Sequence, residues 1–240
     1  MHWFFTTHIE GALLHLTGEE ARHCSKVLRM QMGDKIQAFD GLGNLYTASI
    51  DQINKREVTA QIFETNQYPE PPYQVHLAIA PTKNISRLEW CIEKSCELGI
   101  TSITPLLCEH SERKIIKPER LDKIILSAIK QSQKTYLPTL QPLTKFNDYL
   151  RQNQQGNKYI CHCAYEENTH LANMYEHQSD THIMIGPEGD FSPTEVSAAV
   201  EAGFLSTGLG KERLRTETAG VYSVSVVHTL QNILANKSNS

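Results

Sequence analysis

The sequence predicts an α/β protein with a small β-rich domain at the front and a larger domain with a parallel sheet behind it. Short strand-like runs and a hairpin turn fill the region before residue 68, whereas apolar strand-like runs alternate with helical windows from residue 75 onward. Repeated strand–helix alternation is typical of a parallel sheet with helices on both faces. With 240 residues, 40% of them apolar, the chain is long enough to bury a core in each domain.

The first domain is expected to contain one helix and a β-hairpin. Thr17 and Glu20 have the spacing of a capping box, which predicts a helix over residues 18–30. The turn from Asp40 to Asn44 contains two glycines and joins two strand-like runs as a hairpin. The strand-like runs of this domain are residues 35–39, 45–53 and 57–63.

The boundary between the domains is predicted from prolines. Three of the four residues from Pro69 to Pro72 are proline, which favours an extended connection over a helix or a central strand. We therefore divide the chain into a first domain of residues 1–68, a linker of residues 69–74 and a second domain of residues 75–240.

The second domain contains five strand-like runs separated by helical windows. The runs are residues 75–80, 103–107, 158–163, 182–185 and 204–209. The clearest helical windows are residues 85–98, 119–134 and 217–235. Ligands of parallel sheets bind outside the carboxyl ends of the strands, so the loops after these runs form the candidate site.

Composition excludes several classes of protein. No run of about 18 apolar residues is present, so we expect no membrane span. The N-terminus lacks the basic start and the apolar core of a secretion signal. Six cysteines without a dense framework favour reduced thiols over disulfides. We therefore expect a cytoplasmic protein.

Charge is distributed unevenly along the chain, although the net charge is only −4. Residues 22–35 contain four Lys or Arg and one acidic residue. Residues 113–134 contain seven Lys or Arg and two acidic residues. Residues 164–201 contain eight Asp or Glu and no Lys or Arg. This segregation suits a basic face that docks on a phosphate backbone, and solvated helix faces are the alternative explanation.

The first of two glycine-bearing turns follows the run at residues 182–185. Gly186 ends the apolar run, and Gly189 permits a positive φ or a close approach of the backbone to a ligand. Ser192 and Glu195 then have capping-box spacing at the start of a helix. The turn matches neither G-x-G-x-x-G nor the P-loop, which argues against a dinucleotide or a triphosphate. An ordinary structural turn is the alternative.

The second turn begins at Gly210, and Thr216 is the expected N-cap of the last helix. Between them stand Arg213 and Arg215. An arginine beside a pocket can hold a carboxylate or polarise a carbonyl oxygen through its donors. In the alternative interpretation, these arginines pair with neighbouring glutamates in an ordinary charged loop.

No metal site is expected. Cys161, His162 and Cys163 would point alternately to opposite faces of a strand, and no second pair at zinc spacing accompanies them. Cys91 and Cys96 are interpreted as buried residues of a helix, again without ligand partners at the usual spacing.

The two turns resemble the paired signature of the SPOUT methyltransferases, and more narrowly of the RsmE family. Further similarity comes from His23 with Val27-Leu28-Arg29, from the turn at residues 39–43, and from residues 93–100 leading to Pro105-Leu106. The resemblance spans nearly the whole chain. It implies a PUA-like β-barrel as the first domain, and a SPOUT domain with a parallel sheet and a deep trefoil knot as the second.

The resemblance also implies a cofactor, S-adenosyl-L-methionine, held in the knot largely by backbone groups of three loops. Carried onto this sequence, the cofactor-binding residues are Cys161, His162, Gly186, Pro187, Glu188, Gly189, Leu209, Gly210, Leu214, Thr216 and Thr218.

The reaction implied by the resemblance is methylation of N3 of a uridine, at the m3U1498 position of 16S rRNA in the small ribosomal subunit. Arg215 is expected to stabilise negative charge on a uracil carbonyl oxygen, and Glu217 or Glu188 to orient Arg215 or accept the N3 proton. RNA is the expected partner, not DNA or a membrane. The expected RNA contacts are Arg22, His23, Lys26, Arg29, Arg113, Lys114 and Lys117.

The family works as a homodimer, so the apolar stripe of the final helix suits either a dimer interface or the core of one subunit. That stripe consists of Val221, Val224, Val227 and Leu230.

The chain departs from the family pattern at four positions, where the family usually has an acidic residue, glycine, arginine and proline. These positions are Lys130, Gln133, Lys134 and Lys211. Two alternatives stay open: a SPOUT methyltransferase that acts on a different rRNA or tRNA nucleotide, and a non-catalytic RNA-binding module.

Overall fold

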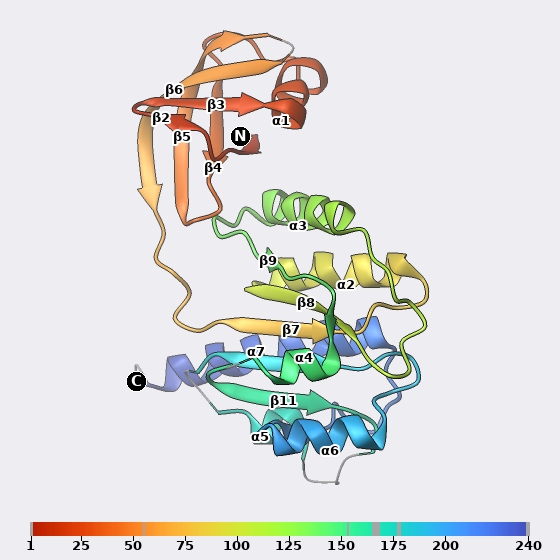
Figure 1. Ribbon diagram of the computed structural model, residues 1–240. Helices are drawn as coiled ribbons and strands as arrows, with labels where there is room; N and C mark the ends of the chain where they lie inside the picture. Colours follow the sequence, from red (N-terminus) through yellow and green to blue (C-terminus); the bar gives the residue numbers. More distant parts are fainter. Residues whose placement is uncertain (1, 55, 153, 165–168, 177–178, 239–240) are drawn as a thin grey trace. The chain divides into compact units, whose positions relative to one another are not determined.

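The computed structural model describes residues 2–54, 56–152, 154–164, 169–176 and 179–238 (Figure 1). The chain forms two compact units. The first consists of Met1–Glu70 and Leu126–Leu137, and the second of Pro71–Ile125 and Pro138–Ser240. The chain thus leaves the first unit near the predicted linker, residues 69–74. It returns to the first unit for residues 126–137, which the predicted division assigns to the second domain.

The first unit contains a six-stranded sheet. Its order is β1-β4-β5-β6-β3-β2, and every neighbouring pair is antiparallel except β1 with β4. The hairpin of β4 and β5 confirms the prediction, whereas β1 to β3 were not predicted because runs of two to five residues carry little periodicity. The strands are β1 (Trp3–Phe5), β2 (Ile9–Glu10), β3 (Leu13–Thr17), β4 (Lys35–Phe39), β5 (Asn44–Ile53) and β6 (Glu57–Gln67).

The helix predicted at residues 18–30 is shorter in the structure, and its second half is a π-helix instead of an α-helix. A five-residue α-helix, α1 (Gly18–Arg22), continues into one π-helical turn, η1 (His23–Val27). The helical path ends before Arg29, whose φ of 54° is left-handed. The buried Ala21 and Cys24 attach this segment to the core of the first unit.

The capping box predicted for this helix is wrong. Thr17 makes no side-chain hydrogen bond to the helix start. The carboxylate of Glu20 instead accepts a hydrogen bond from the backbone N–H of Phe5 at 3.4 Å and pairs with Lys130 Nζ at 2.7 Å. Tertiary partners therefore outcompete the local cap.

The second unit is built on a parallel sheet. Its order is β10-β8-β7-β12-β11-β13, with β9 pairing with β8, and all pairs are parallel. This arrangement confirms the predicted α/β class with a separate β-sheet at the N-terminus. The strands are β7 (Val75–Ile79), β8 (Ser102–Leu107), β9 (Thr139–Leu140), β10 (Thr144–Lys145), β11 (Asn157–Cys161), β12 (Thr181–Ile185) and β13 (Leu205–Thr207).

Helices cover both faces of this sheet, because successive residues of each buried strand point to opposite sides. On one side Leu77 and Ile79 of β7 lie against α7, next to α2. On the other, Ala78 shares a core with Phe146 of α4 and Ala199 of α6. The helices of this unit are α2 (Ile85–Leu98), α4 (Phe146–Leu150), α5 (Leu171–Met174), α6 (Pro193–Glu201) and α7 (Thr216–Ser238), whereas α3 (Pro118–Ser132) begins in this unit and continues into the first unit from Leu126.

Close packing of α7 depends on Gly220. A methyl group at this position would lie 2.7 Å from Cys91 Sγ and 2.9 Å from Ile79 Cδ1. In the apolar stripe of α7, Val224 and Val227 are fully buried within the single chain, which supports core packing for these two residues. Among the described residues, no helix is both long and apolar enough to cross a membrane.

Candidate active site

Four parallel strands of the second unit end at the same edge of the sheet. Cys161, the last residue of β11, is in register with Ile185 at the end of β12 and with Thr207 at the end of β13. Ile185 is in turn in register with Ile79 at the end of β7. The loops that follow these strands therefore emerge side by side, where parallel sheets bind ligands.

The loop after β12 is held by contacts from neighbouring loops. Gly186 is buried, and a side chain there would meet Phe191 at 3.1 Å. Asp190, which adopts a left-handed φ of 65°, accepts a hydrogen bond through its carboxylate from the backbone N–H of Cys163 at 2.9 Å. Gly189 packs against His110, whose Nδ1 lies 3.2 Å from its carbonyl oxygen. The turn is thus a fixed scaffold.

The capping box predicted after this loop is confirmed. Ser192 Oγ accepts a hydrogen bond from the backbone N–H of Glu195 at 3.3 Å, and the Glu195 carboxylate accepts one from the N–H of Ser192 at 3.0 Å. The other carboxylate oxygen of Glu195 accepts from the N–H of Glu109 at 2.8 Å. Both sides of the turn are therefore anchored.

A cavity of about 610 Å³ opens beside the second predicted turn. It brings together four predicted site residues, Leu214, Arg215, Glu217 and Thr218, with four others. The others are Ser86, Arg87 and Trp90 from α2, together with Arg213. The remaining predicted cofactor residues do not line this cavity. Cys161 ends β11, Thr216 begins α7, and the others lie in the loops that follow β11, β12 and β13.

Glu217 is the buried acid of this cavity. Its side chain is 10% exposed, and Oε1 lies 3.6 Å from Nε of Arg87. Its Oε2 is buried, and no described group forms a hydrogen bond to it. Because a buried polar atom without a partner is costly, this oxygen is suited to receive a hydrogen bond from a bound ligand.

The other candidate acid, Glu188, has a different environment. It is exposed, and its Oε1 accepts a hydrogen bond from the backbone N–H of Lys83 at 2.9 Å. Glu188 therefore connects the loop after β12 to the loop after β7. Among the described residues, no ion pair joins the Arg215 side chain to either glutamate, and Arg87 is the arginine that meets Glu217.

Burial changes the pKa values of Cys161, at the end of β11, and of His162, directly after it. Burial raises the pKa of the Cys161 thiol to about 12, so the thiol is protonated at neutral pH, and its Sγ lies 3.4 Å from Thr207 Oγ1. Burial also lowers the pKa of His162, although Asp190 opposes the shift. His162 is thus neutral at pH 7, with its Nε2 2.7 Å from Ser206 Oγ.

The predicted N-cap Thr216 is itself the first residue of α7. It is buried, as expected for a residue that fixes the start of the helix behind the cavity. The boundary is therefore one position earlier than predicted, which is within the ordinary uncertainty of helix ends.

The predicted RNA contacts divide between the two units. Arg22, His23, Lys26 and Arg29 are all exposed on α1, η1 and the turn that follows. In the second unit Lys114 and Lys117 are exposed, whereas the guanidinium of Arg113 donates to the carbonyl oxygens of Thr82 at 3.0 Å and Lys83 at 2.6 Å. Arg113 thus supports the loop after β7.

Two family models match the chain. One, for an RNA methyltransferase domain, covers residues 69–228, and the other, for an RNA methyltransferase PUA domain, covers residues 16–63. A ribosomal RNA small subunit methyltransferase E from Bacillus subtilis is 31% identical over 91% of this chain and 90% of its own length. This chain belongs to the ribosomal RNA small subunit methyltransferase E family.

Solved structures of similar proteins support the same family assignment. A probable rRNA methyltransferase from Porphyromonas gingivalis is 35% identical, with a TM-score of 0.90 over 98% of this chain and 100% of that one. A ribosomal RNA small subunit methyltransferase E from Neisseria gonorrhoeae, bound to S-adenosyl methionine, is 28% identical. Its TM-score is 0.86, over 96% of this chain and 98% of that one.

Besides Ser86, the cavity residues that the sequence did not predict are Arg87 and Trp90. They stand three positions apart near the start of α2, so they share one side of the helix. The sequence carries one signal, since the large aromatic Trp90 falls outside the apolar side of the helix. In the structure, Trp90 is 44% exposed. In this methyltransferase family member, the start of α2 therefore forms part of the cavity wall together with Arg215.

Proposed function

We propose that this chain transfers a methyl group from S-adenosyl-L-methionine to N3 of the uridine at the m3U1498 position of 16S rRNA. Support comes from the family to which it belongs and from the relative that binds this cofactor. The single observation that carries the proposal is the cavity that joins Arg215 to the buried, unsatisfied Glu217 at the carboxyl edge of the sheet.

The surroundings of the cavity fit the cofactor. Gly210 has a φ of 114°, and a side chain at this position would meet no atom within 4 Å, so the space beside it can receive a ligand. The loops of Gly186 to Gly189 and of Leu209 to Thr218 would hold the cofactor mainly through backbone groups. When bound, S-adenosyl-L-methionine supplies an electrophilic methyl group.

The residues of the chain then prepare the uracil. Uracil N3 is a weak nucleophile until its proton is removed, and the negative charge then spreads onto the carbonyl oxygens. Arg215, which is exposed at the cavity, donates to one of these oxygens. Glu217 accepts the N3 proton on Oε2, the oxygen that has no described partner, while Arg87 holds the other oxygen.

Glu217 suits the role of proton acceptor better than Glu188. Glu188 already accepts a backbone hydrogen bond and belongs to the wall of the neighbouring loop, whereas Glu217 lines the cavity. We assign Glu188 to holding the cofactor loop in place.

The first domain, residues 1–68, binds RNA in this proposal, and residues 75–240 carry out the transfer. Arg22, His23, Lys26 and Arg29 contact phosphates, which position the substrate without reading its sequence. In the second unit, Lys114 and Lys117 also contact phosphates, whereas Arg113 contributes through the loop that it supports. The target base leaves its stack to reach the cavity.

The enzyme acts as a homodimer in the cytoplasm, where small ribosomal subunits are made. The dimer rests on the family resemblance, in which the cofactor loop of one subunit faces an RNA-binding surface of the other. Sedimentation analysis of the full chain gives the oligomeric state, and a purely monomeric species at micromolar concentration would contradict the dimer.

Mass spectrometry of small-subunit rRNA tests the function directly. The rRNA from cells with and without the protein is digested to nucleosides and to fragments that include the m3U1498 position. We expect N3-methyluridine only when the protein is present. An unchanged N3-methyluridine signal with loss of another modification would indicate a different target nucleotide. Absence of S-adenosyl-L-methionine binding in calorimetry would indicate a non-catalytic RNA-binding module.

A further inference from the structure

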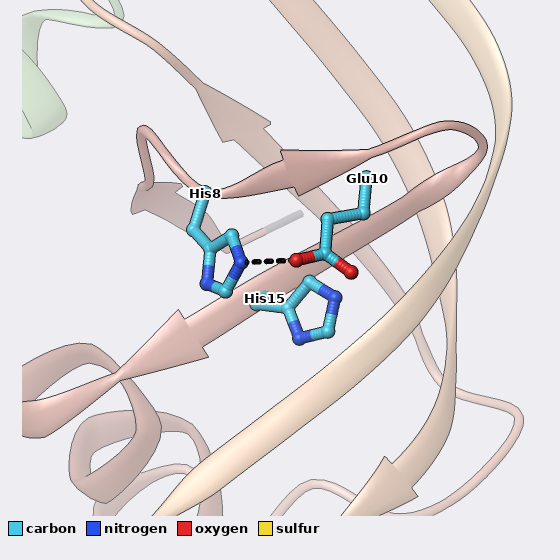
Figure 2. A group of neighbouring side chains, drawn as sticks. All are labelled: His8, Glu10 and His15. Atoms are coloured by element: carbon cyan, nitrogen blue, oxygen red, sulfur yellow. Dashed lines mark hydrogen bonds and ion pairs between the residues drawn. The ribbon is translucent and has the colours of Figure 1, made fainter.

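Three potential metal ligands meet on the first unit, in a region that methyl transfer does not use. They are His8, which immediately precedes β2, Glu10 in β2 and His15 in β3 (Figure 2). The backbone N–H of His15 donates to the carbonyl of His8 at 3.0 Å, so the two histidines are cross-strand neighbours. Glu10 lies two residues after His8 and thus on the same face of the strand.

The ligand atoms of these residues are already close. His8 Nε2 lies 2.9 Å from Glu10 Oε1, and the rings of His8 and His15 are stacked with centroids 4.4 Å apart. One ligand atom from each residue lies within 4.8 Å of the others.

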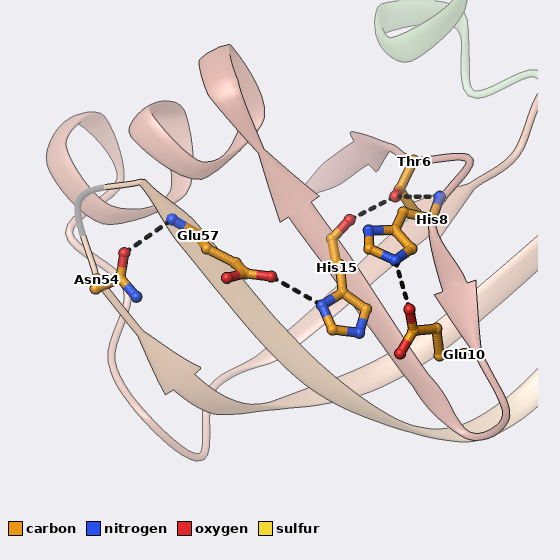
Figure 3. A network of polar contacts seen from close by, with 6 residues as sticks. All are labelled: Thr6, His8, Glu10, His15, Asn54 and Glu57. Carbon is orange, nitrogen blue, oxygen red and sulfur yellow. Dashed lines mark hydrogen bonds and ion pairs between the residues drawn. The ribbon is translucent and has the colours of Figure 1, made fainter.

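Glu57 of β6 orients His15 from behind (Figure 3). Its Oε1 lies 2.9 Å from Nδ1 of His15, and its own backbone N–H is held by Asn54 Oδ1 at 2.9 Å. A carboxylate on one ring nitrogen fixes the tautomer of a histidine and makes the other nitrogen a better ligand. That other atom, Nε2 of His15, is buried, and no described group forms a hydrogen bond to it.

We propose that His8, Glu10 and His15 bind a divalent transition-metal ion of the Zn²⁺ type. The ion takes the place of the proton between His8 Nε2 and Glu10 Oε1, and it satisfies the orphaned Nε2 of His15. Two imidazoles and one carboxylate, with water as a fourth ligand, form a tetrahedral set that Zn²⁺ accepts.

The ligand chemistry selects the class of ion. Imidazole nitrogens suit Zn²⁺, Cu²⁺ and Ni²⁺, whereas Mg²⁺ and Ca²⁺ prefer oxygen ligands. Ligand atoms of a tetrahedral zinc site are about 3.3 Å apart, from bond lengths of about 2.0–2.1 Å. The exposed side chains of His8 and Glu10 can make this adjustment by rotation, because 52% and 68% of their surfaces are exposed.

Metal binding would stabilise the hairpin formed by β2 and β3. The ion joins the start of β2 to β3, and Glu57 extends the connection to β6. Because β2 has only two residues and pairs with β3 alone, this edge of the sheet gains more from a cross-link than its interior does. The site therefore stabilises the first unit and is independent of the methyl-transfer reaction.

Calorimetric titration of the metal-free full chain with ZnCl₂ tests the proposal. We expect one tight site per chain in the micromolar range. His8→Gln and Glu10→Gln each remove one ligand at an exposed position, so each is expected to weaken this site at least tenfold without loss of fold, as circular dichroism would confirm. Glu57→Gln is expected to weaken it about 10–100-fold, although it leaves all three ligands in place.

His2→Gln is the matched control, because His2 is an exposed histidine of the same unit outside the cluster. It is expected to leave the affinity unchanged. Titration with Co²⁺ provides a second readout, since tetrahedral nitrogen and oxygen ligation gives visible absorption bands that His8→Gln should abolish. The proposal is overturned if the wild type binds no Zn²⁺ in the micromolar range, if His8→Gln and Glu10→Gln retain its affinity, or if His2→Gln weakens binding equally.

Discussion

Two residues of the cavity, Arg215 and Glu217, have opposite environments at the scale of single side chains. Arg215 is exposed to solvent, so it is available to a substrate that arrives from outside. Glu217 is buried beside Arg87, with one oxygen unsatisfied by any described group. A donor for developing negative charge and an acceptor for a proton therefore line the same cavity.

Replacing Arg215 by alanine is expected to reduce kcat for methylation of 16S rRNA by about 10²–10³-fold, as for the loss of one donor to a developing oxyanion. Methyl transfer from labelled S-adenosyl-L-methionine measures the effect. Lys211→Ala, an exposed cation of the same loop outside the cavity lining, is the control and should retain kcat. Normal turnover of Arg215→Ala would exclude the proposed role.

The choice between the two acids is tested with isosteric changes. Glu217→Gln is expected to lower kcat by about 10²–10⁴-fold, the usual contribution of a general base, because the amide cannot accept the N3 proton. Glu188→Gln keeps an oxygen that can accept the hydrogen bond from Lys83 and should lower kcat far less. Single-turnover kinetics with saturating cofactor separates the chemical step from binding. Equal losses in both variants would contradict the assignment.

At the scale of elements, the site depends on how closely α7 approaches α2 and the sheet. Glu217 and Thr218 at the start of α7 line the cavity together with Ser86, Arg87 and Trp90 of α2. Gly220, one turn further along, sets the spacing, since a methyl group there would overlap with Cys91 Sγ. The packing of α7 against α2 and the position of the cavity residues at the start of α7 thus both depend on Gly220.

Gly220→Ala is expected to lower the free energy of unfolding by about 1–3 kcal/mol, because the helix must shift to accommodate the extra methyl group. Urea unfolding followed by circular dichroism measures the change. Cys91→Ala removes the nearest clashing atom, so the double variant should be less destabilised than the sum of the two single variants. Strict additivity would show that the two positions are not in contact.

Two neighbouring strands also carry a pH-sensitive pair. His182 of β12 stacks on His76 of β7 with centroids 4.4 Å apart, and its Nε2 donates to the carbonyl of Gln155 at 3.1 Å. Burial, and then the charge of His76, lower the pKa of His182 to about 4, with Asp180 opposing the shift and Lys158 adding to it. The folded state therefore favours neutral His182.

Because the unfolded chain binds this proton at a pKa of about 6.5, unfolding takes up a proton between pH 6.5 and 4. Stability should be fully present above pH 6.5 and should fall as the pH decreases through this window. His182→Gln is expected to flatten the dependence of the unfolding free energy on pH, whereas the exposed His2→Gln should not. An equally steep dependence in His182→Gln would rule out this contribution.

At the scale of the whole molecule, charge is distributed unevenly along the chain. The net charge is −4, yet Arg22, Lys26 and Arg29 are all exposed in the first unit. A local group of exposed cations suits binding to a phosphate backbone even when the net charge is negative.

Lys26→Ala is expected to weaken binding to RNA of any sequence and to reduce the slope of log affinity against log salt by about one. Arg56→Ala is the control, because Arg56 is an exposed cation of the same unit outside the predicted contact set. Filter binding at several salt concentrations gives both slopes. An unchanged slope for Lys26→Ala would remove this residue from the RNA contacts.

The sequence by itself determined the α/β class, the positions of the main strands along the chain and the start of α6, because these features depend on local periodicity and on capping by near neighbours. Ser192 and Glu195 show this, since both members of their capping box are three residues apart and both bonds form. Family resemblance added the reaction and the cofactor, which no periodicity encodes.

Tertiary structure decided the features that join distant residues. Thr17 and Glu20 have the same local spacing as Ser192 and Glu195, but Phe5 and Lys130 compete successfully for Glu20. Arg87 meets Glu217 from 130 positions away, and His8, Glu10, His15 and Glu57 meet because three strands pair in one register. Contacts of this kind depend on the path of the whole chain, so spacing along the sequence does not reveal them.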